Sequence, residues 1–143
     1  RQMDEALRAA VIAGAYWRTA AAPVIIAYAG AVAPEALQAH GMLQEQDVPA
    51  SLLAITSPDR LHADWLANRG QSHIARLLAD AGHGARIIPV VDAHPATLSW
   101  LGAVAGHPVY PLGVSSFGQS ADIVDLFAHH KIDANAIVAA AMM

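Results

Sequence analysis

The segment that decides the fold reads YPLGVSSFGQSADIVDLFAHH and spans residues 110–130. An apolar run over 109–114 leads into a polar turn, and Gly118 lies at the corner. A helix is predicted next, because the Ser120 hydroxyl can accept a hydrogen bond from an N–H of the first turn. Asp122 places negative charge near the positive end of that helix. The segment therefore predicts a strand, a tight loop and a helix.

Three more predicted strands precede this strand-to-helix segment. Continuous apolar runs at 23–29, 48–56 and 86–91 are typical of strands that are buried on both faces of a parallel sheet. Helical patterns separate or follow these runs at 34–46, 60–68, 73–81, 97–104 and 134–143, with Ser72 and Asp133 as predicted caps. The alternation predicts a three-layer αβα domain with a mostly parallel sheet and right-handed crossovers.

The N-terminal part follows a different pattern. Residues 4–13 form an amphipathic pattern that Gly14 ends, and 15–19 is short and aromatic, as in an edge strand. We expect Tyr16 and Trp17 to lie at contacts with other domains.

Composition limits the class of protein. The chain has 143 residues, which suits one domain, and 55% of them are hydrophobic while only 14% are charged. Such low charge favours a piece of a larger protein with interfaces over an unusually alanine-rich free surface. A net charge of −4 with scattered basic residues argues against a nucleic-acid surface. There is no cysteine, no signal-peptide pattern and no apolar run long enough to span a bilayer, so we expect a cytoplasmic protein without membrane contact.

Several motifs carry a family resemblance. They are Gly14–Arg18, Ala54–Ser57, Val90–Ala93, Leu112-Gly113, Phe117-Gly118, Gln119-Ser120, Leu126, Ile132-Asp133-Ala134 and Val138–Ala141. With them the chain resembles the C-terminal domain of the transketolase and thiamine-diphosphate-dependent 2-oxoacid dehydrogenase superfamily. Within it, the chain is most similar to the homodimeric pyruvate dehydrogenase decarboxylating component.

The resemblance implies a fold for this segment and places the cofactor in other domains of the enzyme. The fold would be a five-stranded mixed sheet with an antiparallel N-terminal edge strand, formed by 15–143, with 1–14 as a linker and helix leading in. The two preceding domains of such enzymes bind thiamine diphosphate and Mg²⁺. This sequence lacks both the Gly-Asp-Gly metal motif and the glutamate that activates the cofactor in these enzymes. The resemblance therefore implies no catalytic residue and no bound cofactor in this segment.

The implied function is that of an interface domain. The parent enzyme would decarboxylate pyruvate and transfer the acyl group to a lipoyl carrier, and this segment alone would be inactive. The implied partners are the preceding cofactor-binding domains, a homodimer mate and the lipoyl acyltransferase component. One alternative is the same domain of a transketolase or a deoxyxylulose phosphate synthase. Another is a stand-alone flavodoxin-like binding or regulatory module, although Ala-Gly-Ala-Val-Ala at 29–33 is a poor phosphate loop.

Polar residues that follow the predicted strands define a candidate site. Ligands of open α/β sheets bind beyond the carboxyl ends of the strands, where Asp92, His94, Ser116, Gly118 and Ser120 are expected. This edge would face a neighbouring domain or bind a small anion at the start of the Ser120 helix. Ser116, His94 and Asp92 would also suit a hydrolase triad, but the chain has no Gly-x-Ser-x-Gly elbow.

A metal site is not expected from the histidines. His129 and His130 are adjacent, so on a helix they diverge by about 100° and do not easily share one metal. His73, His83 and His94 lie near predicted loops or caps, without cysteines or clustered carboxylates beside them.

Overall fold

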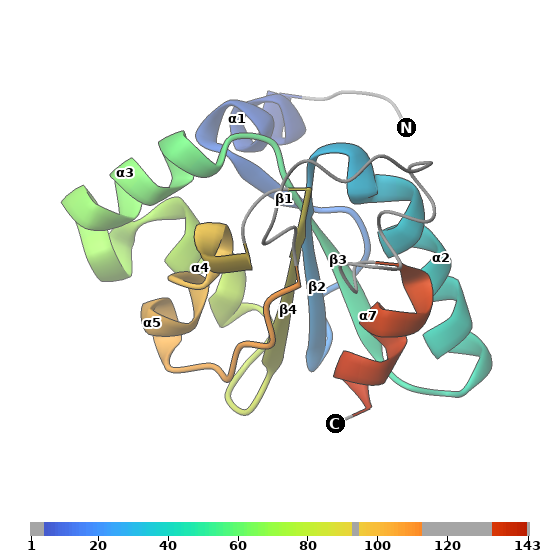
Figure 1. Cartoon of the computed structure of the whole chain (residues 1–143). Coiled ribbons are helices and arrows are strands. Elements are labelled where there is room, and N and C mark those ends of the chain that lie inside the picture. Colours follow the sequence, from blue (N-terminus) through green and yellow to red (C-terminus); the bar gives the residue numbers. More distant parts are fainter. Residues whose placement is uncertain (1–4, 93–94, 113–132, 143) are drawn as a thin grey trace.

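The computed structural model describes residues 5–92, 95–112 and 133–142 of the chain (Figure 1). Its centre is a four-stranded sheet in the order β1-β3-β2-β4. The strands are β1 (Ala15–Trp17), β2 (Val24–Ala29), β3 (Ala50–Ile55) and β4 (Arg86–Val91). Strand β2 is parallel to both β3 and β4, whereas β1 is antiparallel to β3. The predicted mixed sheet with an antiparallel N-terminal edge strand is thus confirmed.

Helices cover both faces of this sheet. They are α1 (Glu5–Ala13), α2 (Ala33–Glu45), α3 (Pro58–Asn68), α4 (His73–Ala79), α5 (Leu101–Ala105) and α7 (Ala134–Ala141), with 3-10 turns η1 (Gly30–Val32), η2 (Arg69–Gln71) and η3 (Pro95–Leu98). Helices α2 and α7 lie on one face, while α3, α4 and α5 lie on the other (Figure 1). This arrangement confirms the three predicted layers. None of the described helices is both long and apolar enough to cross a membrane.

The two faces have separate cores that alternate along each strand. Ile26 and Tyr28 of β2 pack toward α2 and α7, while Ile25 and Ala27 pack toward α3, α4 and α5. Burial on both faces explains why these strands are continuous apolar runs. Tyr16 and Trp17 of β1 are partly buried against opposite cores, so neither is a fully exposed contact residue.

The structure corrects the prediction of a fifth strand. Among the described residues, 109–112 run parallel to β4 but pair with it only at two isolated bridges, Ile87 with Val109 and Val90 with Leu112. Tyr110 N–H donates to Ile87 O at 3.0 Å, and Leu112 N–H donates to Pro89 O at 2.8 Å. Pro89 lies between these bonds and has no N–H for the Tyr110 carbonyl. One missing donor therefore interrupts the ladder. The remainder of the predicted strand, 113–114, lies outside the described residues.

The predicted helix boundaries need small corrections, and the predicted caps at Ser72 and Asp133 are confirmed. Ser72 Oγ accepts from Ala75 N–H at 3.3 Å, and Asp133 Oδ1 accepts from Ala136 N–H at 2.9 Å. Helix α4 ends at Ala79, two residues before the predicted end, and the predicted helix 97–104 is divided into η3 and α5.

Candidate functional site

Only one of the five predicted site residues lies in the described part of the chain. Asp92 follows β4 directly, at the carboxyl edge of the sheet. His94, Ser116, Gly118 and Ser120 lie outside the described residues. The predicted anion site and the alternative triad therefore stay predictions.

Asp92 connects the ends of two strands. Its Oδ2 accepts a hydrogen bond from Ala31 N–H at 3.2 Å, in the 3-10 turn that follows β2. The same carboxylate lies against Gly30, whose φ of 79° is in the left-handed region. A side chain at Gly30 would collide with Asp92 Oδ1. Asp92 is exposed, so this contact gives it a structural role without burying its charge.

The polar residues after β3 also have structural roles. Thr56 Oγ1 donates to Val11 O at 2.6 Å, and Thr56 N–H donates to Gly14 O at 2.8 Å. Ser57 Oγ caps α3 by accepting from Arg60 N–H at 3.3 Å. These contacts fix the C-terminal end of α1 beside the carboxyl end of β3.

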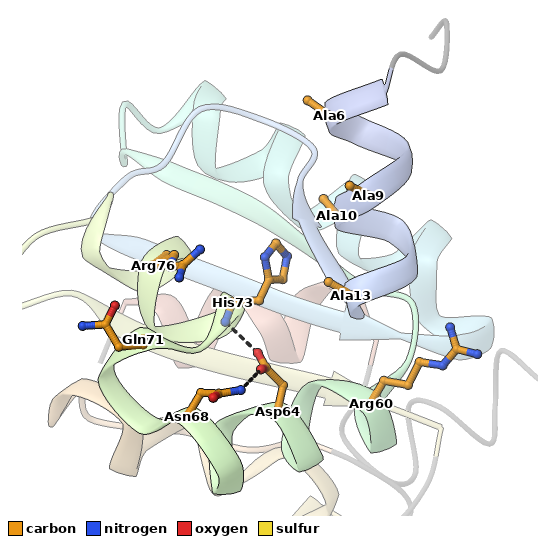
Figure 2. A pocket seen from close by; sticks show the side chains of 10 residues that line it. All are labelled: Ala6, Ala9, Ala10, Ala13, Arg60, Asp64, Asn68, Gln71, His73 and Arg76. Atoms are coloured by element: carbon orange, nitrogen blue, oxygen red, sulfur yellow. Dashed lines mark hydrogen bonds between the residues drawn. The ribbon is translucent and has the colours of Figure 1, made fainter.

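A pocket of about 690 Å³ lies between α1, α3 and α4 (Figure 2). We call it the α1/α3/α4 pocket. It is lined by Ala6, Ala9, Ala10, Ala13, Arg60, Asp64, Asn68, Gln71, His73 and Arg76. The alanines form one wall along α1, and the polar side chains come from the other two helices and the turn between them.

Asp64 organises the polar side of this pocket. Its Oδ2 accepts from His73 N–H and its Oδ1 accepts from the Asn68 side-chain amide, each at 2.7 Å (Figure 2). The hydrogen bond from the His73 backbone, followed by that from Asn68, holds the pKa of Asp64 below its ordinary value of 3.8. Asp64 is therefore a fixed carboxylate at neutral pH.

His73 joins α4 to the edge of the sheet. Its Nε2 lies 2.7 Å from Ala15 O, as donor to that carbonyl. Gly14 O and Arg18 N–H both bond toward β3, so the Ala15 carbonyl between them points away from the sheet. The imidazole thereby satisfies an acceptor on an edge strand that would otherwise be available to another strand. Its Nδ1 is the nitrogen that can bond a ligand.

Two arginines complete the pocket. Arg60 and Arg76 are exposed and lie on either side of His73 and Asp64 in Figure 2. Arg60 Nη1 donates weakly to Ile12 O at 3.4 Å, near the C-terminal end of α1, where positive charge is favourable. The pocket thus has two cationic groups, one fixed carboxylate and an apolar wall. This set can bind a ligand, but it holds no nucleophile paired with a base.

Sequence reasoning missed the α1/α3/α4 pocket. The available signal was the spacing of Arg60, Asp64 and Asn68, which places three polar side chains on one face of α3. The alanines of the opposite wall also share one face of α1 by their spacing, but alanine is common on both buried and exposed helix faces, so they do not indicate a pocket. Among the described residues, no three His, Cys, Asp or Glu side chains gather where they could hold a metal ion.

Comparisons with solved structures identify the fold. The transketolase of Campylobacter jejuni matches with a TM-score of 0.64 and 20% identity, over 91% of this chain and 18% of that one. The transketolase of Leishmania mexicana matches with a TM-score of 0.65 and 18% identity, over 94% of this chain and 18% of that one. A Pichia stipitis transketolase in complex with sedoheptulose 7-phosphate matches with a TM-score of 0.65 and 20% identity, over 99% of this chain and 19% of that one.

These matches establish a transketolase-like C-terminal-domain fold. The chain spans about a fifth of the length of these transketolases. No family model matches the sequence, and a comparison with curated proteins finds no significant match. The closer likeness to pyruvate dehydrogenase stays a prediction.

Proposed function

We propose that this chain is the C-terminal domain of a thiamine-diphosphate-dependent enzyme of the transketolase superfamily. The main support for this proposal is the sheet order β1-β3-β2-β4 with an antiparallel edge strand. This fold aligns with transketolases over up to 99% of the chain. Fold likeness alone does not fix chemistry, so the activity of the parent needs its own evidence.

For the parent enzyme we propose a transketolase rather than a pyruvate dehydrogenase. The matched proteins are named transketolases, and structures from Pichia stipitis are complexes with xylulose 5-phosphate, fructose 6-phosphate or sedoheptulose 7-phosphate. The proposed substrate class is therefore sugar phosphates. The sequence resemblance still favours pyruvate, which makes pyruvate the competing substrate in any assay.

In this proposal the domain itself supports the enzyme without supplying reacting groups. The proposal assigns the cofactor no ligand in this domain, and the described residues contain no group of three or more His, Cys, Asp or Glu side chains that could hold a metal ion. The cofactor would bind elsewhere in the parent. The proposed partners are the cofactor-binding domains of the same chain and a second copy of the enzyme.

The test compares the natural protein that contains this chain with the 143-residue chain itself. The mass of the natural protein is measured first. It is then assayed with thiamine diphosphate and Mg²⁺ for two-carbon transfer between sugar phosphates and for pyruvate decarboxylation. Cofactor binding to the 143-residue chain is measured by calorimetry.

We expect a natural protein several times longer, with sugar-phosphate activity and with no cofactor binding by the short chain. Pyruvate decarboxylation coupled to lipoyl acylation would replace the transketolase proposal with the pyruvate dehydrogenase prediction. A natural protein of the same length as this chain, without either activity, would contradict both and favour a binding module.

A further inference from the structure

We propose that the α1/α3/α4 pocket binds a small organic anion, a carboxylate or phosphate ester with a short apolar body. The cationic group of Arg76 would bind the charged end, and the alanine wall of α1 would contact the apolar part. This inference does not depend on the proposed function, because the whole pocket is formed by this chain.

The charge inside the pocket is opposite to that of the protein. The chain carries a net charge of −4, yet the described lining residues include two arginines and one carboxylate. That carboxylate, Asp64, already accepts hydrogen bonds from His73 N–H and from Asn68. A local positive excess on an acidic protein attracts anions to this site specifically.

The other lining groups of the pocket favour an organic ligand over an inorganic ion. His73 and Gln71 supply hydrogen-bonding atoms beside Arg76, and Ala6, Ala9 and Ala10 supply apolar surface opposite them. A volume of about 690 Å³ lies within the range of small-molecule sites and far exceeds one phosphate ion. A guanidinium binds carboxylates and phosphates through two parallel hydrogen bonds, so either group suits Arg76.

The test is an NMR titration of the chain at constant ionic strength with three probes: succinate, glycerol 3-phosphate and inorganic phosphate. We expect saturable shifts of the Asp64, His73 and Arg76 amide signals with at least one organic anion, and weaker binding of inorganic phosphate. The stronger of the two organic probes identifies the charged group. Arg76→Gln is expected to weaken binding about tenfold.

Two matched controls separate a site from general charge effects. Arg8→Gln removes the same charge from an exposed position on α1 outside the lining, and should change affinity by less than about twofold. Ala9→Glu should abolish binding by placing a carboxylate in the pocket, whereas Ala67→Glu on the exposed surface of α3 should not. Shifts that do not saturate, equal binding of inorganic phosphate, or equal effects of Arg8→Gln and Arg76→Gln would each overturn the proposal.

Discussion

Asp64 accepts a hydrogen bond from the backbone N–H of His73 at 2.7 Å, so one carboxylate of α3 binds the first residue of α4. This N–H is one of the donors that have no partner within their own helix. Ser72 accepts from a second one, at Ala75. The start of α4 is thus capped by its own chain and by the preceding helix, and the two helices are held as a pair.

Replacing Asp64 should loosen this pair. Asp64→Ala leaves the His73 N–H without its acceptor, and we expect a loss of about 1 kcal/mol in the free energy of unfolding. Urea denaturation measures the loss. Asp80→Ala is the control, because Asp80 is an exposed acid at the other end of α4, where negative charge is not favourable. Equal losses for both variants would contradict the capping role.

The same carboxylate makes stability dependent on pH. The pKa of Asp64 is lowered in the folded state, so its contribution is present above its unfolded value of about 3.8 and is lost as the pH falls through the lower folded pKa. Wild type should therefore lose more stability than Asp64→Ala between about pH 5 and pH 3. Denaturation midpoints at several pH values test this, and parallel curves would show that Asp64 contributes nothing.

Gly30→Ala should destabilise the carboxyl edge by about 2 kcal/mol or more, because it adds a collision to a strained backbone. The added Cβ would meet the Asp92 carboxylate at a φ of 79°. Gly82→Ala is a matched control: Gly82 has a φ of 74°, and nothing lies within 4 Å of the added atom. It should cost about 1 kcal/mol. In an Asp92→Ala background the two glycine substitutions should become nearly equal, and thermal unfolding of the single and double variants measures this.

The two serine caps should differ in importance. Ser72 is buried, and its Oγ donates to Arg69 O at 2.6 Å while accepting from Ala75 N–H. Ser57 is only half-buried, and its Oγ accepts a capping bond from Arg60 N–H at 3.3 Å. Ser72→Ala should cost about 1–2 kcal/mol and Ser57→Ala about half of that. The reverse order in chemical denaturation would show that burial does not strengthen the α4 cap.

Tyr28 should control stability at high pH. Burial raises the pKa of Tyr28 above its ordinary 10.0, although the hydrogen bond and the charge of Arg18 act in the opposite direction. With a raised folded pKa, the contribution is complete below pH 10.0 and falls as the pH rises toward the folded value. Tyr28→Phe should flatten this alkaline loss of stability. A spectroscopic titration in which all three tyrosines ionise together at their ordinary value would contradict it.

The parallel core could be predicted because its strands are buried on both faces. Residues 86–91 match β4, and 23–29 differs from β2 by one residue. Strand β3 is shorter than 48–56, because Val48 N–H bonds back to Leu43 O and Pro49 has no N–H to donate. Apolar content alone does not distinguish such flanking residues from the strand.

The candidate sites were less predictable, for two physical reasons. Asp92 follows its strand as expected, but a sequence does not reveal that Ala31, 61 positions away, donates to its carboxylate. The α1/α3/α4 pocket depends on how α1 lies against the α3–α4 pair. Its alanines at 6, 9, 10 and 13 recur at helical spacing, but alanine does not distinguish a pocket wall from a packed or an exposed face. Local patterns predict elements, whereas the space between elements is set by tertiary contacts.

The antiparallel edge strand has a consequence for the order of folding. Strand β1 pairs with β3, matching Ala15 with Ile55, and β2 and α2 lie between them in the sequence. In the described sheet β1 pairs with β3, and β3 pairs in turn with β2. Closing this long loop early would cost entropy with no compensating contacts. We expect β1 and α1 to join a preformed β2-β3 pair late in folding, as the last strand added at that edge.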